Sequence, residues 1–202
     1  MEWSSQTQTN AGILYNPMYE YLLVAHPDEN VYLRVAEEKQ SFFDIYKEKI
    51  AVKTKPHITV ACFLAKEVME ETMIRWMQRI ISNQQRFIVL LNNYSGFPPH
   101  TVYLRIQDHQ PFKQLASSLK VIDQYVRGND CPAMKLVTHP HLSVARGLPK
   151  DVYEKAIIAY AQKSFFDSFE VNELVLLKRQ NQFENCVQVS KFHLSEDSRL
   201  FN

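Results

Sequence analysis

The sequence predicts an α/β protein built from two similar lobes that face each other across a shared cleft. Strand-like and helix-like segments alternate along the chain, which is typical of mixed α/β folds. Their order begins again about halfway along, and a short motif occurs once in each half. A repeat of this kind is expected to place its two copies of the motif on opposite sides of the cleft.

The first half of the chain, about residues 19–99, reads as strands and helices in alternation. Short apolar runs predict the strands, and apolar residues at three- and four-residue intervals predict amphipathic helices. Asp28 stands where it can cap the first helix. The expected elements are a strand at 19–25, a helix at 29–49, a strand at 57–64, a helix at 67–82 and a strand at 86–91.

The second half, about residues 100–202, repeats this order after a break. The break is the stretch Ser-Gly-Phe-Pro-Pro at 95–99, because glycine and consecutive prolines interrupt regular structure. The expected elements are a strand at 101–106, a helix at 111–126, a strand at 141–146, a helix at 150–162 and a final strand pair at 169–177 and 185–194.

The size of the chain predicts a single domain. With 202 residues, 46% of them hydrophobic, it can bury a substantial core. We expect residues 19–202 to form one bilobal domain after a flexible leader at 1–18, which shows no periodicity. The formal net charge of +1 excludes the strongly basic character of proteins that hold long nucleic acids. A short or single-nucleotide ligand suits this charge better.

Other features of the sequence bear on where in the cell the protein is located. The N-terminus lacks the basic start and apolar stretch of a secretory signal, and no segment is apolar for long enough to cross a bilayer. The cysteines Cys62, Cys131 and Cys186 have no two-residue spacing, so they indicate neither a disulfide framework nor a zinc ribbon. We expect a cytoplasmic monomer with no membrane contact and no obligate protein partner.

The strongest functional signal is a duplicated hexapeptide, PHITVA in the first half and PHLSVA in the second. Because side chains alternate along a strand, His57 and Thr59 share one face, and so do His141 and Ser143. A single strand histidine is more often structural. A second copy at the corresponding place in a repeated order is hard to explain by packing alone.

Two imidazoles on opposite sides of one phosphoryl group can divide acid and base work between them. One ring can be neutral and the other protonated near neutral pH, so the reaction requires no metal. The hydroxyls of Thr59 and Ser143 can donate hydrogen bonds to non-bridging oxygens, on which charge accumulates in the transition state. No cofactor is expected.

Five further residues are candidates for substrate binding. Arg146 follows the second motif and can pair with a phosphate, while Lys53 and Lys55 can attract an anion to the mouth of the cleft. Phe97 and Tyr103 are candidates for stacking on a base. Each also has an ordinary structural interpretation. Arg146 can form a surface salt bridge, the two lysines can be solvated in a loop, and the two aromatic residues can pack in the core.

On these motifs the sequence resembles the two-histidine phosphoesterase superfamily, which includes 2′-5′ RNA ligases and RNA 2′,3′-cyclic phosphodiesterases. The resemblance extends from about Tyr19 to Leu194 and also includes the Gly-Phe-Pro break before the central strand. It implies a bilobal fold of antiparallel sheet and helices with pseudo-two-fold symmetry. It further implies that His57 and His141 are the catalytic pair; which is acid and which is base stays open, and we favour His141 as base and His57 as acid.

The implied activity is hydrolysis of a 2′,3′-cyclic phosphate at an RNA end or on a nucleotide, or formation and cleavage of a 2′-5′ linkage. Three alternatives stay open. The substrate could be a cyclic phosphate of another nucleotide metabolite, or the chain could be a nucleotide- or RNA-binding module without turnover. A metal hydrolase that uses His139 and His141 is the third, although no carboxylate or cysteine cluster stands near them in the sequence.

Overall fold

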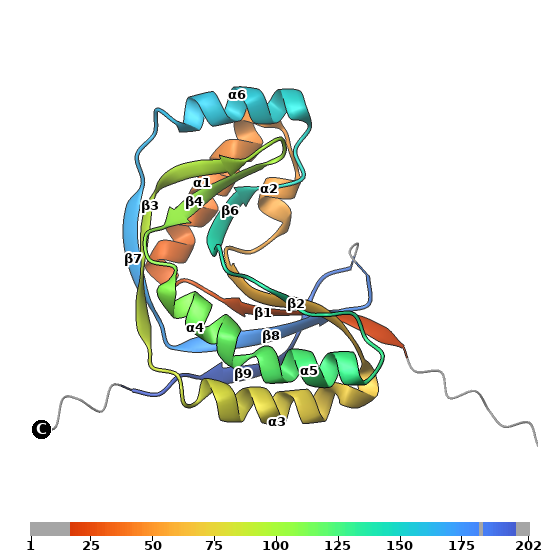
Figure 1. The fold of residues 1–202 in the computed structure, drawn as a ribbon. Helices are drawn as coiled ribbons and strands as arrows, with labels where there is room; N and C mark the ends of the chain where they lie inside the picture. Colours follow the sequence, from red (N-terminus) through yellow and green to blue (C-terminus); the bar gives the residue numbers. More distant parts are fainter. Residues whose placement is uncertain (1–16, 182–183, 197–202) are drawn as a thin grey trace, which may run out of the picture.

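The computed structural model describes residues 17–181 and 184–196, which contain one antiparallel sheet flanked by helices (Figure 1). Within these residues the strands are β1 (Met18–Ala25), β2 (Ile58–Lys66), β3 (Phe87–Phe97), β4 (Thr101–Ile106), β5 (Lys135–Leu136), β6 (His141–Ala145), β7 (Phe166–Val171), β8 (Glu173–Arg179) and β9 (Val187–His193). Their order in the sheet is β7-β3-β4-β6-β2-β1-β8-β9, and β5 pairs with β2.

The helices lie in two groups, one at each end of this sheet. They are α1 (Glu29–Tyr46), α2 (Ile50–Lys53), α3 (Glu70–Ile81), preceded by a 3₁₀ turn at Glu67–Met69, α4 (Gln110–Ser118), α5 (Lys120–Gly128) and α6 (Lys150–Tyr160). Helices α1 and α6 pack on β7, β3, β4 and β6, whereas α3, α4 and α5 gather on the other end around β9 and β2 (Figure 1). No helix among the described residues is both long and apolar enough to span a bilayer.

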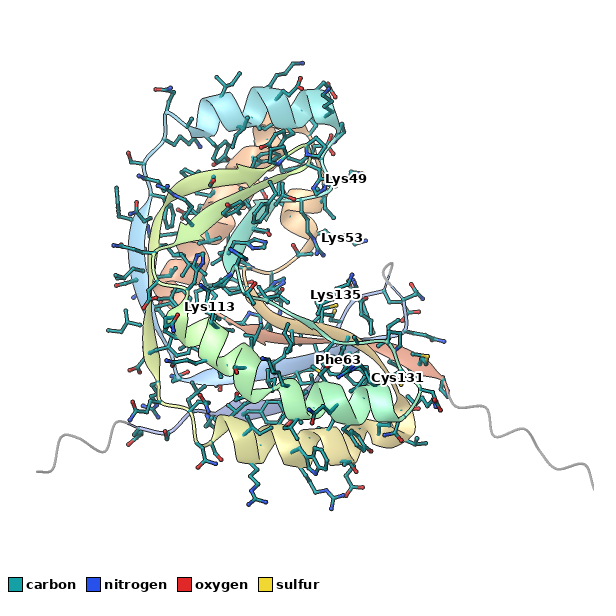
Figure 2. The ribbon with its side chains drawn as sticks, in the orientation of Figure 1. Lys49, Lys53, Phe63, Lys113, Cys131 and Lys135 are labelled. Atoms are coloured by element: carbon teal, nitrogen blue, oxygen red, sulfur yellow. The ribbon has the colours of Figure 1, made fainter. Side chains whose placement is uncertain are left out.

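The expected bilobal architecture is therefore present, with the sheet curling between two lobes. The lobes meet where β2 runs beside β6, and their one register pair is Ile58 opposite Leu142. Side chains between sheet and helices form the main core; in the α3–α5 lobe, Phe63 of β2 and Cys131 lie beside α5 (Figure 2) and are buried. The opposite face of β1 and β8 carries a small separate apolar cluster of Leu22, Val24 and Val175.

Two predicted helices are wrong in length: the first ends earlier than expected, and the second is two helices in the structure. The helix expected at 29–49 ends at Tyr46, because Lys47 adopts a left-handed conformation with φ 61° and its N–H bonds the carbonyl of Phe43. The helix expected at 111–126 is two helices that meet at Leu119, whose N–H bonds the carbonyls of both Leu115 and Ser117. Apolar periodicity continues through both points, so it does not reveal them.

The strand predictions need three corrections. The strand expected at 86–91 continues to Phe97, so the chain turns only at the prolines that follow. Strand β5 is an additional short strand that was not expected. The segment expected as one strand at 169–177 is two strands, separated at Asn172. Of these, β8 forms the expected final pair with β9, whereas β7 pairs with β3 in the other lobe.

The sequence halves 19–99 and 100–202 do not correspond to the spatial lobes. Helix α1 of the first half packs on β6 of the second, and α4 of the second half packs on β2 of the first. Strand β3 likewise joins β4, and β8 joins β1. Of the expected leader, residues 1–16 lie outside the described residues, and Met18 already belongs to β1.

Gly96 is required where helix α6 crosses strand β3. A Cβ atom at this position would lie 2.5 Å from the hydroxyl oxygen of Tyr153 and 2.9 Å from Cδ1 of Ile157. Both distances are shorter than van der Waals contact, and Tyr153 is buried. A side chain here would therefore force the side chains of Tyr153 and Ile157 to shift.

We expect Gly96→Ala to lower the free energy of unfolding by about 1–3 kcal/mol, as measured by urea denaturation, because it overpacks this contact. Gly128→Ala is the matched control. Gly128 ends α5 and has nothing within 4 Å of an added Cβ, so alanine there should be neutral or stabilising by up to about 1 kcal/mol. Equal stability of the two variants would contradict this account of Gly96.

Candidate active site

The two motifs meet at the centre of the sheet because β2 and β6 are antiparallel neighbours. Ile58 pairs with Leu142, and this register carries His57 toward Ser143 and Thr59 toward His141. The alternation predicted from the sequence is present: Ile58 and Leu142 are fully buried, whereas the two histidines and two hydroxyl residues are only partly buried. The four polar side chains thus share one face, where the lobes meet.

Both imidazole rings are oriented by the same local hydrogen bond. Nδ1 of His57 lies 2.8 Å from the carbonyl oxygen of Lys55, and Nδ1 of His141 lies 3.1 Å from the carbonyl oxygen of His139. A carbonyl oxygen can only accept, so Nδ1 carries the proton in each ring. Each Nε2 is therefore left to accept a proton when the ring is neutral, or to donate one when it is charged.

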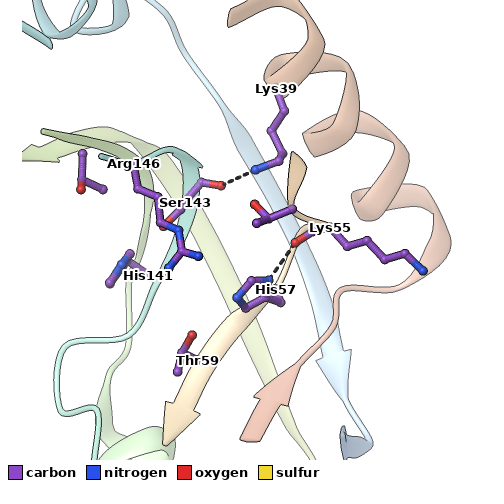
Figure 3. A pocket seen from close by; sticks show the side chains of 9 residues that line it. Lys39, Lys55, His57, Thr59, His141, Ser143 and Arg146 are labelled. Carbon is purple, nitrogen blue, oxygen red and sulfur yellow. Dashed lines mark hydrogen bonds between the residues drawn. The ribbon is translucent and has the colours of Figure 1, made fainter. Parts of the chain in front are cut away.

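The four motif side chains enclose a small cavity of ≈ 100 Å³ (Figure 3). Its lining is positively charged, since three of the side chains are lysine or arginine and none is aspartate or glutamate. The lining residues are Lys39, Thr54, Lys55, His57, Thr59, Thr101, His141, Ser143 and Arg146. A cavity of this size and charge suits a single tetrahedral anion such as a phosphoryl group.

Burial controls the protonation of both histidines. It lowers the pKa of His57 to about 4, and electrostatic interactions with the nearby side chains of His26, Arg146 and Lys39 act in the same direction, against the bond to the Lys55 carbonyl. Burial also lowers the pKa of His141, with smaller contributions from Arg146 and His109. Both rings are therefore neutral at pH 7 in the ligand-free protein.

Of the candidate binding residues, Arg146 and Lys55 line the cavity and Lys53 does not. Lys53 lies at the end of α2 (Figure 2) and lines an adjoining cavity of ≈ 620 Å³, which shares Thr54, Lys55, His57 and Arg146 with the small one. Leu22, Val175 and Leu177 of β1 and β8 form its apolar part. The small cavity is thus positively charged, and the larger one beside it is lined by both apolar and polar side chains.

Phe97 and Tyr103 line neither cavity and instead pack against His141. Their rings stack at a centroid distance of 4.4 Å, and His141 lies 4.9 Å from Phe97 and 5.1 Å from Tyr103. This contact supports the imidazole from the side of β3 and β4. Phe97 is 38% exposed, so part of its ring is accessible at the edge of the site.

Sequence reasoning missed Thr54, which lines the small cavity, and it missed two more lining residues, Lys39 and Thr101. They are also the two buried polar residues of the described chain, with exposures of 4% and 6%. A signal for Lys39 was present, because it follows Val31 and Val35 on the apolar stripe of α1 and precedes Phe42. A charged residue on such a stripe is a candidate for a polar site.

His26 and His139 each lie beside one motif. The ring of His26 donates from Nδ1 to the carbonyl oxygen of Pro56, at 3.0 Å, and so fixes the residue before His57. His139 packs edge-on against His109, with ring centroids 5.9 Å apart. Among the described residues, no group of three or more histidine, cysteine, aspartate or glutamate side chains could hold a metal ion.

Comparison with known proteins places these features in a family. The sequence profile of the 2′-5′ RNA ligase superfamily matches residues 27–183. No curated protein matches the chain.

Among solved structures, Escherichia coli LigT in its apo form is similar at 15% identity and a TM-score of 0.59, over 88% of this chain and 98% of that one. LigT complexed with 3′-AMP gives 16% identity and a TM-score of 0.62, over 88% and 98% of the two chains. TT0787 of Thermus thermophilus has 14% identity and a TM-score of 0.61, over 88% of this chain and 99% of that one. These similarities show that the fold is shared.

We expect both active-site rings to be neutral and protonated on Nδ1 at pH 7, and His57 to stay neutral until the pH falls to about 4. Long-range ¹H–¹⁵N NMR spectra recorded during a pH titration measure both properties. His193, whose side chain is 72% exposed, is the reference ring. An Nε2-protonated tautomer at His57 or His141 would contradict the orientation described above.

Proposed function

The chain belongs to the 2′-5′ RNA ligase superfamily, and from this premise we propose that it is a phosphodiesterase that works through its paired histidines without a metal ion. The substrate we propose is a 2′,3′-cyclic phosphate at the end of an RNA or on a nucleotide. The observation that carries the proposal is the placement of two imidazoles and two hydroxyls around one small, positively charged cavity.

Each group around this cavity has a chemical part in hydrolysis. One ring accepts a proton from water at Nε2 as the water oxygen attacks phosphorus, and the other donates a proton to the ribose oxygen as its bond to phosphorus breaks. Thr59 and Ser143 donate hydrogen bonds to the non-bridging oxygens, and Arg146 offsets their charge. The product is a phosphomonoester with one more hydroxyl on the ribose.

The adjoining cavity supports a nucleotide rather than a smaller phosphodiester as the substrate. Its volume of ≈ 620 Å³ lies in the range of sites that enclose nucleotide-sized ligands. Apolar side chains can contact a base there, and Lys53 can contact a further phosphate. LigT, which shares the fold, has been crystallised with 3′-AMP.

The free cysteines Cys62, Cys131 and Cys186 fit a reducing compartment, and we propose the cytoplasm.

Of the two possible assignments, we propose His141 as the base and His57 as the acid. In the free protein this acid has a pKa of about 4, so it must gain its proton together with the substrate. A phosphoryl anion in the cavity favours this, because a nearby negative charge raises the pKa of an imidazole. The imidazolium formed in this way stands next to the leaving oxygen and can donate its proton there.

We expect the protein to hydrolyse nucleoside 2′,3′-cyclic monophosphates, or a short RNA with a 2′,3′-cyclic end, in the presence of EDTA. His57→Ala and His141→Ala should each lower kcat/KM by about 10²- to 10⁴-fold, because each removes a general acid or base. His193→Ala, at an exposed position of β9 that lines neither cavity, is the matched control. Activity that EDTA abolishes would overturn the metal-independent mechanism.

The same assay tests the alternatives from the sequence. If folded wild-type protein binds 3′-AMP but turns over neither substrate, the binding-module interpretation is favoured. Turnover limited to cyclic phosphates of other nucleotide metabolites, such as an ADP-ribose derivative, would keep the mechanism and change the substrate.

A substrate with a good leaving group tests the acid–base assignment. Nitrophenolate needs no proton to depart, so thymidine 5′-(4-nitrophenyl phosphate) should bypass the acid but still require the base. We expect His57→Ala to retain at least about tenfold more of the wild-type rate on this ester than His141→Ala does. Steady-state release of nitrophenol measures both rates. The reverse ratio would exchange the two roles.

A further inference from the structure

Lys39 is a buried ammonium group beside the two motifs, although it comes from a distant helix. Its side chain is on the apolar stripe of α1 and is only 4% exposed. Nζ lies 3.3 Å from the carbonyl oxygen of Ser143 and 3.2 Å from that of Val144, and it reaches the small cavity (Figure 3). Helix α1 thereby brings a positive charge to the back of strand β6.

The two carbonyl groups use only part of what this ammonium group offers. A lysine ammonium has three N–H donors, and within the described residues Nζ has these two hydrogen-bond partners and no ion pair. No acidic side chain lines the cavity. A buried charge without an opposite charge is costly, and an anion in the cavity would offset that cost.

We infer that Lys39 is a phosphoryl-binding residue of this site, which donates a charge-assisted hydrogen bond to a non-bridging oxygen between His57 and His141. Its other two N–H groups hold the β6 backbone, so that Ser143 and Arg146 face the same anion. This inference rests on the proposed function, because it adds a binding group to the same phosphoryl site.

The charges around Lys39 agree with this role. His141 of β6 and Arg146, directly after it, line the same cavity as Lys39, and so do Lys55 and His57, which precede β2. On its own helix, Glu38 pairs with Lys163 at 3.2 Å, and Arg34 pairs with Asp167 of β7. Glu38 and Asp167 are therefore already paired with other cations.

Burial, together with Arg146, lowers the pKa of Lys39 to about 8. The ammonium form is thus present at pH 7 and is lost from the ligand-free protein as the pH rises above about 8. A bound anion favours the charged form and raises this pKa. Phosphate binding and protonation of Lys39 should therefore be linked.

The test uses inorganic phosphate as the probe and isothermal titration calorimetry as the measurement. At pH 7 we expect Lys39→Met, which keeps most of the aliphatic stem and removes the charge, to weaken phosphate binding by about 10- to 100-fold. Lys155→Met, at an exposed position of α6, is the matched control and should bind as the wild type does. Equal affinity of wild type and Lys39→Met would overturn the inference.

A structural role alone would not produce the expected pH dependence. The ratio of wild-type to Lys39→Met affinity should shrink by at least about tenfold between about pH 7 and pH 9.5, since only the wild type loses a charge there; a constant ratio would contradict a phosphoryl-binding role. If Lys39→Met does not fold, ¹³C NMR of the lysine Cε atoms in the wild type decides. Saturating phosphate must then raise the pKa of Lys39, and an unchanged pKa would overturn the inference.

These measurements separate this inference from the proposed function. Lys39-dependent phosphate binding without turnover of any cyclic phosphate would leave Lys39 as a binding residue and remove the enzymatic proposal. Turnover of a cyclic phosphate, together with phosphate binding that does not depend on Lys39, would keep the enzymatic proposal and remove the role of Lys39. Failure of the wild type to bind phosphate at about 10 mM would overturn the role of Lys39.

Discussion

The arrangement of this protein depends on one backbone contact, the antiparallel pairing of Ile58 with Leu142. Each of these residues follows a histidine, so a single register decides which polar groups face one another. A shift of one residue would turn every motif side chain to the opposite face of its strand. The buried apolar residues between the histidines and hydroxyls oppose such a shift, because they would then be exposed.

Much of this site could be predicted from the sequence because its main residues lie on strands with strict alternation. The duplicated hexapeptide predicts that both histidines and both hydroxyl residues belong to the site. It also points to Arg146, which comes directly after the second copy. The bilobal α/β architecture likewise follows from element order. Such features depend on local pattern alone, and local pattern survives in a single sequence.

The features that could not be predicted are those that depend on contacts between distant segments. The apolar stripe of α1 marks Lys39 as an unusual charged residue, but only the packing of α1 on β6 shows which site it belongs to. The pairing of β7 with β3 rather than with β9 likewise depends on contacts between distant segments. The helix ends at Lys47 and Leu119 depend on backbone conformations that no glycine or proline marks there.

The exchange of elements between the two sequence halves bears on the origin of the duplication. A chain of half this length would carry one histidine motif, one edge of the cavity and a first helix with no partner strand of its own. Two such chains related by a two-fold axis could supply each other's missing helix and close the cavity between them. Fusion of the two genes would then join subunits that already shared one active site, and each copy of the motif would become free to diverge, as threonine and serine have at residues 59 and 143.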